Sequence, residues 1–305
     1  MIKQKNKNLD IMVVATMSSG KSTFINSIIG REIIPSKNEA CTAKICKIVN
    51  DKTRNDFCVF GLDKYKNKVF KYTSMNLECM DYLNDNEDIL MSEIIGNIEN
   101  LDTYNGMSVT IVDTPGPNNS QDITHSKITI DTIKNITDDT LVLYVINATQ
   151  IGVDDDYNLL RLVRDEVYLK GGQDRVIFIL NKIDQIDLQK ESIEQVIINT
   201  KEYLKNSGVE EPYVYPASSY IAKNIRKVLS GEHVTKKEQR SFYDVDDLDL
   251  LKYVPLNNSS KDELQDEIDL CIKNRDEERE LLYYTGIPYI EKAINDYIRC
   301  FVNIN

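Results

Sequence analysis

The chain has 305 residues, of which 41% are hydrophobic and 28% charged, and its formal net charge at pH 7 is −12. This acidity argues against a nucleic-acid partner, since phosphate contacts need excess positive charge, and against docking on an anionic membrane by bulk charge. No apolar run approaches the roughly 18 residues of a membrane helix, and the first residues lack the apolar core of a signal peptide. We therefore expect a cytoplasmic protein whose six cysteines are reduced thiols.

Short β-branched apolar runs alternate along the chain with segments whose apolar residues recur every three or four positions. The expected strands are Leu9–Ala15, Met107–Asp113, Thr140–Ile146, Arg175–Leu180 and Pro212–Tyr215. The expected helices are Lys21–Ile29, Ser126–Ile136, Asp154–Lys170 and Ser192–Ser207, the last one opened by a capping box from Ser192 to Gln195. This alternation predicts an α/β fold, a mostly parallel sheet with helices on both faces, with ligands at the carboxyl ends of the strands.

Two regions do not fit a minimal α/β repeat. In Asp51–Asn105 we expect strands near Phe57–Gly61 and Lys68–Tyr72, then a helix from about Asn76 to Ile98. The second region runs from Tyr220 to the end. Its segment Asp244–Glu280 carries 13 acids against 5 bases, which is typical of a solvated helix face or an insertion. The pattern Thr285-Gly-Ile-Pro then predicts a turn before a helix over Tyr289–Phe301.

A phosphate-binding loop is predicted after the first strand. The residues Ala15-Thr-Met-Ser-Ser-Gly-Lys-Ser22 match the pattern GxxxxGK[ST] between a strand and a helix, with Ala15 in place of the first Gly. Gly20 lets successive N–H groups point at phosphate oxygens, and the helix that follows adds its positive N-terminal end. Lys21 is placed to reach the β- and γ-phosphates, and the Ser22 hydroxyl to ligate Mg²⁺.

Asn181-Lys-Ile-Asp184 stands at the carboxyl end of a predicted strand and favours guanine over adenine. The Asp184 carboxylate would accept from the ring N–H and the exocyclic amine of guanine, a donor pair that adenine lacks. The Lys182 stem would pack on the base, and Asn181 would tie this loop to the phosphate loop. Ser218 and Ser219 follow the last strand, where a backbone N–H would contact guanine O6. A P-loop ATPase remains an alternative that this segment opposes.

Three further residues are candidates for the γ-phosphate and Mg²⁺. Asp113-Thr-Pro-Gly116 follows a predicted strand as a DxxG segment, in which the Asp holds Mg²⁺ through water and the Gly N–H contacts the γ-phosphate. Thr42 lies between this segment and the phosphate loop, so it is our candidate for the threonine that completes the Mg²⁺ shell. Thr53, in a polar turn, is its competitor.

In these motifs the chain resembles the dynamin superfamily of GTPases, specifically its bacterial dynamin-like branch. The loop Met17–Ser22, the 71 residues that separate Thr42 from Asp113, and the segment Thr285–Ile294 carry the resemblance beyond a generic GTPase. It implies a P-loop GTPase fold with an enlarged dynamin-type G domain over residues 1–284, including an acidic insertion at about 220–280. Residues 285–305 would then form a helix that leads toward a stalk absent from these 305 residues.

The resemblance also implies an activity and a set of site residues. The activity is Mg²⁺-dependent hydrolysis of GTP to GDP and phosphate, stimulated when two copies pair through the nucleotide face, with room for a monovalent cation near Ser18. The full system would couple it to self-assembly or membrane remodelling, with a membrane or a second dynamin-like subunit as partner and a peripheral location there. The expected catalytic residues are Ser18, Lys21 and Thr42, and the expected metal ligands are Ser22, Thr42 and Asp113. The expected nucleotide contacts are Met17, Ser19, Gly20, Lys21, Ser22, Thr23, Gly116, Asn181, Lys182, Asp184, Ser218 and Ser219.

Met17 departs from the family pattern, since eukaryotic dynamins carry a Gln at this position. Pro117 has no side-chain amide to orient water, and the dynamin family likewise lacks the Gln that small GTPases carry there. Arg31, directly after Gly30, is the nearest arginine that could act as a catalytic arginine finger, with a surface residue as the alternative interpretation. Two alternatives to a hydrolase therefore stay open: a GTP-binding switch or scaffold with very slow hydrolysis, and a structural module with a vestigial site.

Overall fold

The computed structural model describes residues 7–35, 44–73, 77–104, 106–115, 123–187, 189–243 and 261–304. Within them one sheet of nine strands is assembled from β1 (Lys7–Ala15), β2 (Ile45–Asn50), β3 (Cys58–Leu62), β4 (Lys68–Tyr72), β5 (Met91–Gly96), β6 (Met107–Asp113), β7 (Thr140–Asn147), β8 (Val176–Asn181) and β9 (Val214–Ala217). The helices described are α1 (Lys21–Ile29), α2 (Leu77–Asp85), α3 (Ile123–Lys134), α4 (Asp154–Glu166), α5 (Ile193–Asn206), α6 (Ser219–Leu229), α7 (Lys236–Tyr243), α9 (Lys261–Asn274), α10 (Glu277–Tyr284) and α11 (Ile287–Ile304).

The strand order in the sheet is β4-β3-β5-β2-β6-β1-β7-β8-β9. The central strands β6, β1, β7, β8 and β9 pair in parallel. Antiparallel pairs occur where β2 meets β6 and where β3 meets β4 and β5. The predicted α/β architecture with a mostly parallel sheet is therefore confirmed.

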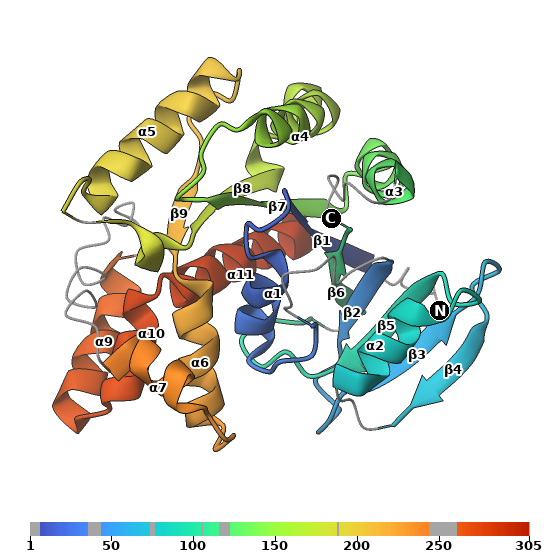
Figure 1. Ribbon diagram of the computed structural model, residues 1–305, viewed down its shortest axis with the longest axis horizontal. Helices are drawn as coiled ribbons and strands as arrows, with labels where there is room; N and C mark the ends of the chain where they lie inside the picture. The colour runs from blue at the N-terminus through green and yellow to red at the C-terminus, as the bar shows by residue number, and fades with distance from the viewer. Residues whose placement is uncertain are drawn as a thin grey trace.

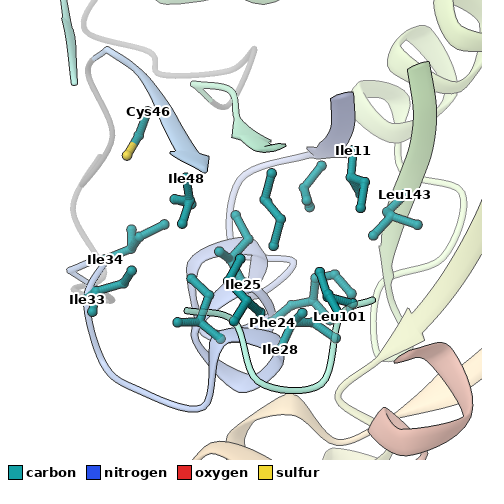
Figure 2. Packing of buried hydrophobic residues seen from close by; sticks show 14 of the residues in the cluster. Ile11, Phe24, Ile25, Ile28, Ile33, Ile34, Cys46, Ile48, Leu101 and Leu143 are labelled. Carbon is teal, nitrogen blue, oxygen red and sulfur yellow. The ribbon is translucent and has the colours of Figure 1, made fainter. Parts of the chain in front are cut away.

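Helices cover both faces of the central strands. One core lies between the sheet and α1, α2 and α11 (Figure 2 shows part of it), and a second lies between the other face and α3, α4 and α5. Figure 1 shows α3, α4 and α5 above β7 and β8, and α1 and α11 below these two strands. Because both faces are covered, all eight positions of β7 and all six of β8 are buried.

The outer part of the sheet contains the main departure from expectation. The helix predicted up to Ile98 is wrong, because α2 ends at Asp85 and Met91–Gly96 forms strand β5. Strand β2 was not expected either. Both strands alternate buried and half-buried positions, the pattern of a strand with one well-covered face. Their buried residues, such as Ile48 and Ile94, share the core with Met80 of α2.

The expected strands and the helix starts at Lys21 and Asp154 lie within two residues of the observed ones. Ser192 caps α5, since its hydroxyl oxygen accepts from the Gln195 N–H at 3.2 Å. In the acidic segment, residues 244–260 lie outside the described ranges, and the rest forms α9 and α10. The C-terminal helix, predicted over Tyr289–Phe301, packs against the core through a buried stripe made of Ile287, Ile290, Ile294, Ile298 and Phe301. Among the described helices, none is long and apolar enough to cross a membrane.

Candidate functional site

The loop between β1 and α1 is held in an unusual backbone conformation. Ser18 and Gly20 have φ angles of +63° and +85°, both in the left-handed region. The Thr16 and Ser19 hydroxyls lie 2.8 Å apart, within hydrogen-bond distance. A Cβ at Gly20 would stand 2.5 Å from Asn181 Nδ2. Gly20 is therefore required both by its φ angle and by the close approach of Asn181.

Asn181, 2% exposed at the end of β8, joins two loops. Its Nδ2 donates to the Ser19 carbonyl at 2.9 Å, and its Oδ1 accepts from the N–H and the hydroxyl of Ser219 at 3.1 and 2.7 Å. This side chain thus connects the loop after β1 with the loop after β9. The parallel strands β1, β7, β8 and β9 make the connection possible, since their carboxyl ends share one edge of the sheet.

Asp184 lies in a short turn after β8, preceded by Lys182 with a left-handed φ of +67°. Burial raises the pKa of the Asp184 carboxyl, and a hydrogen bond from the Ser218 hydroxyl at 2.5 Å opposes that rise. The Ser218 N–H donates to the Thr285 carbonyl at 2.9 Å. Since the Ser219 N–H bonds Asn181, the backbone amides of both Ser218 and Ser219, in the loop predicted to contact guanine O6, donate to protein oxygens in this structure.

Lys21 and Asp113 form a buried ion pair at the start of α1 and the end of β6. The Lys21 ammonium donates to Asp113 Oδ1, while Oδ2 is buried and receives no hydrogen bond from the described residues. An acceptor-only oxygen with no partner fits a Mg²⁺ shell or one of its waters, and the Ser22 hydroxyl is a second oxygen donor. In the described part of the chain, no group of three or more His, Cys, Asp or Glu could hold a metal. Beyond Asp113 and Ser22, phosphate and water oxygens and the predicted ligand Thr42, which lies outside the described residues, would complete such a shell.

Several predicted residues make none of the contacts described so far or lie outside the described residues. Thr42 and Gly116 fall outside the described residues. Met17 is 52% exposed on the loop, next to the exposed Ser18, and Thr23 is half-buried on α1. Arg31 follows the C-terminal cap of α1, at the end away from the phosphate loop, and pairs with Asp56 at 3.1 Å. This placement does not support a catalytic role for Arg31 in its own site.

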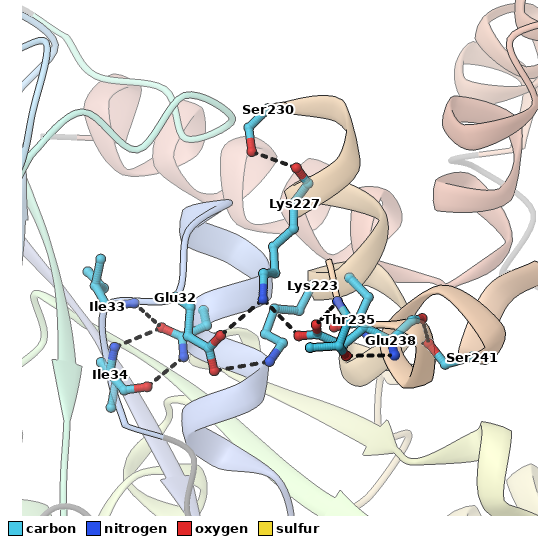
Figure 3. A network of polar contacts seen from close by, with 11 residues as sticks. Glu32, Ile33, Ile34, Lys223, Lys227, Ser230, Thr235, Glu238 and Ser241 are labelled. Carbon is cyan, nitrogen blue, oxygen red and sulfur yellow. Dashed lines mark hydrogen bonds and ion pairs between the residues drawn. The ribbon is translucent and has the colours of Figure 1, made fainter. Parts of the chain in front are cut away.

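Sequence reasoning missed the polar network in Figure 3, which holds the segment after α1. Glu32 pairs with Lys223 at 3.1 Å and Lys227 at 3.5 Å, both on α6, and Lys227 also pairs with Glu238 at 2.7 Å. Asn26 accepts the N–H groups of the two residues after Glu32. The sequence offered one signal for this network, the two lysines four positions apart on the amphipathic helix α6. It could not show their partner, because Glu32 is far away in sequence. The network connects this segment to α6, the helix that begins at Ser219.

The model of the dynamin family matches residues 11–183, more than half of the chain. A bacterial dynamin-like protein of Nostoc punctiforme is 25% identical over 182 residues, which cover 58% of this chain and 25% of that protein. The tRNA modification GTPase MnmE of Pseudothermotoga lettingae is 25% identical over 142 residues, which cover 45% of this chain and 30% of that protein. The chain thus spans about a quarter of the first relative's length and less than a third of the second's.

Two solved structures with similar folds come from work on an oligomerised bacterial dynamin pair, described as a mechanism for the long-range sensing and tethering of membranes. One has a TM-score of 0.54 at 17% identity and covers 98% of this chain and 46% of its own. The other has a TM-score of 0.53 at 18% identity, with 92% and 52% covered. At these identities the likeness shows a shared fold, the G-domain fold expected from the sequence.

Proposed function

The chain belongs to the dynamin family, a family of GTPases, and on that premise we propose that it binds GTP and hydrolyses it to GDP and phosphate. The observation that carries the proposal is the double role of Asn181, which bonds Ser19 of the phosphate loop and Ser219 of the guanine loop. A base-reading segment tied to a phosphate loop is what a nucleoside triphosphate requires, because base and phosphates must be held at one fixed separation.

Guanine would be read by Asp184. As a carboxylate it offers two acceptor oxygens to the ring N–H and the exocyclic amine, and the Ser218 hydroxyl holds it in place. The Lys182 side chain approaches Gly20, because a Cβ built on that glycine would lie 3.6 Å from Lys182 Cε. Its stem is therefore positioned beside the phosphate loop, where it can pack on the base. Adenine offers no matching donor pair to a carboxylate.

The phosphates would be held by the N–H groups of residues 17–23, including those of Ser19, Gly20 and Ser22, and by the N-terminal end of α1. Lys21 would leave Asp113 for the β- and γ-phosphates, and Asp113 and Ser22 would turn to Mg²⁺. When bound, Mg²⁺ neutralises charge on the phosphate oxygens. Ser18 would contact the bridging oxygen or a monovalent cation beside it. Thr42 and the Gly116 N–H are proposed for the attacking water and the γ-phosphate.

Assembly and location are proposed from the family. Two copies would pair through the nucleotide face, where the exposed Met17 lies on the phosphate loop. Residues 1–284 would form the G domain, with α11 leading toward further helices that self-assemble or contact a membrane or a second dynamin-like subunit. We place the protein in the cytoplasm or peripherally at a membrane, without a nucleic-acid partner.

The test is phosphate release from GTP under multiple turnover, with and without Mg²⁺, with ATP as control and over a hundredfold range of protein concentration. We expect release only from GTP, dependence on Mg²⁺, and a rate per molecule that rises with concentration if pairing stimulates the site. A rate per molecule that stays flat would remove the dimer from the proposal. GTP binding without multiple turnover would instead support the alternative of a GTP-binding switch with very slow hydrolysis, which the departure at Met17 leaves open.

A further inference from the structure

The turn between α10 and α11 presses against the loop that follows β9, and Figure 1 shows the two side by side. At its centre Gly286 has a φ of +80°. A Cβ at this position would overlap the carbonyl oxygen of Pro216 and lie 3.1 Å from its carbonyl carbon and 3.4 Å from Ala217 Cα. All these neighbours are backbone atoms, so they cannot rotate away as a side chain would. Any residue other than Gly must therefore displace the end of β9.

A chain of hydrogen bonds continues from this turn to the base-reading carboxylate. The Thr285 carbonyl accepts the Ser218 N–H at 2.9 Å, and the Ser218 hydroxyl donates to Asp184 Oδ1 at 2.5 Å. Thr285 and Ser218 are both fully buried. Water therefore does not compete for the bond between them, and a shift of the turn is passed on to Asp184 through the Ser218 hydroxyl.

We propose that Thr285 and Gly286 are positioning residues for guanine recognition, acting through Ser218 on the orientation of Asp184. The inference rests on the proposed function, because it names a further determinant of the same site. Its substrate-level consequence concerns the exocyclic amine of guanine, which Asp184 accepts. A misplaced Asp184 would lose the distinction between GTP and ITP, since ITP lacks this amine and is otherwise the same nucleotide.

Gly231 supplies a matched control for the backbone. It has a φ of +73° and stands just after α6, the helix that starts at the guanine loop, but a Cβ there would meet nothing within 4 Å. Gly231→Ala therefore carries the same left-handed strain as Gly286→Ala without the overlap. Any difference between the two variants reports the contact with Pro216 rather than the φ angle.

The experiment measures dissociation constants for GTP and ITP by calorimetry on the wild type, Gly286→Ala and Gly231→Ala, after thermal melting has shown that each variant is folded. In the wild type we expect ITP to bind roughly tenfold more weakly, the effect of losing a hydrogen bond to a charged group. In Gly286→Ala the dissociation constant for ITP divided by that for GTP should fall about fivefold or more, towards one, because part of that hydrogen bond is lost. In Gly231→Ala the ratio should stay at the wild-type value, since general destabilisation weakens both nucleotides alike.

A milder pair of variants decides the matter if Gly286→Ala does not fold. The Thr285 hydroxyl donates to the Leu282 carbonyl at 2.6 Å and is 3.4 Å from the Ile287 N–H, so Thr285→Ala loosens the turn without adding bulk. We expect its ratio to fall in the same direction and Thr285→Ser to restore it. When Thr285→Ala is added to Ser218→Ala, we expect no further change in the ratio of the two dissociation constants, because the Ser218 hydroxyl that links the turn to Asp184 is already missing.

An unchanged ratio in folded Gly286→Ala and Thr285→Ala, beside a normal wild type, would overturn this inference alone. A wild type that binds neither nucleotide would overturn the proposed function and this inference with it.

Discussion

The central strands β7 and β8 and the outer strands β2 and β5 belong to one sheet but differ in burial. Every residue of β7 and β8 is buried, whereas β2 and β5 bury only alternate residues. Helices cover both faces of the central strands, while the buried positions of the outer strands share one core with α2. The candidate site follows this division, since its described residues stand at or just beyond the ends of β1, β6, β8 and β9.

The difference in burial indicates that a nucleotide site in such a sheet forms at the ends of strands that are covered on both faces. Side chains that follow doubly covered strands lie in surroundings that exclude water, so Asn181 and Asp113 are held by few but well-protected contacts. The outer strands widen the sheet, and β2 borders the site where its Cys46 pairs with Asp113 of β6. Substitutions in the two regions should therefore have effects on activity and stability that differ in size and, for the pH dependence of stability, in sign.

The largest difference is expected for two lysines. Lys21→Ala should lower phosphate release from GTP about a hundredfold to a thousandfold, because a buried cation at the phosphates is lost. Lys47→Ala, on the half-buried face of β2, removes only a long contact to Asp10 at 3.8 Å and should leave the rate unchanged. Steady-state assays at saturating Mg²⁺ compare them. Equal losses in both variants would show that the outer strands take part in the site.

Two isoleucines test the difference in packing. Ile11→Ala in β1, where the side chain is fully buried, should lower the free energy of unfolding by about 2–5 kcal/mol. Ile95→Ala, at a half-buried position of β5, should cost roughly 1 kcal/mol, because less apolar area is lost. Urea unfolding followed by circular dichroism measures both. A cost at Ile95 as large as that at Ile11 would mean that the outer face is covered in solution.

Asp184→Asn sharpens the view of the base-reading edge. The amide replaces one acceptor with a donor, so GTP affinity should fall about a hundredfold. XTP, which carries a carbonyl where guanine has its amine, should gain affinity over its wild-type value. Competition binding with both nucleotides gives the two constants. Loss of affinity for XTP as well would indicate damage to the loop rather than a change in reading.

The smallest effects, opposite in sign, are expected for two aspartates. Burial raises the pKa of Asp156 in the central region, although the Tyr144 hydroxyl donates to it at 2.8 Å and opposes the rise. The stability from this group is present below its unfolded pKa and is lost as pH rises through the folded pKa. As pH rises, the melting temperature of Asp156→Asn should therefore increase relative to that of the wild type, and at neutral pH it should be about 2 °C higher.

Asp63, in the outer hairpin, should behave in the opposite way. Hydrogen bonds from Asn67 lower the pKa of Asp63, so its contribution is present above its unfolded pKa and is lost as pH falls through the folded pKa. Asp63→Asn should melt below the wild type at pH 7, and the difference should close in acid. Melting curves from pH 3 to 8 test the pair. The same pH trend in both variants would contradict the assignment.

How far the sequence could predict the fold depended on the same division. The continuous apolar runs of β1, β7 and β8 are strong signals, and the predicted strands match the observed ones within two residues. Met91–Gly96 reads Met-Ser-Glu-Ile-Ile-Gly, whose apolar spacing also fits a helix, so its assignment needed its neighbours β2 and β3. A half-covered strand has a weaker sequence signal, because half of its side chains are partly exposed and need not be apolar.

For the candidate site, the amino-acid sequence alone specifies the order of the segments and the residue types. A carboxylate after β8 and a Gly-Lys-Ser at the start of α1 narrow the possible chemistry before any coordinates are known, because few residue types can bind phosphate and guanine in this way. Only the tertiary structure decided which groups meet. It placed Asn181 between two loops, took Arg31 away from the phosphate loop, and brought Gly286 against the end of β9. These contacts join residues far apart in sequence, and no local pattern encodes the distance between them.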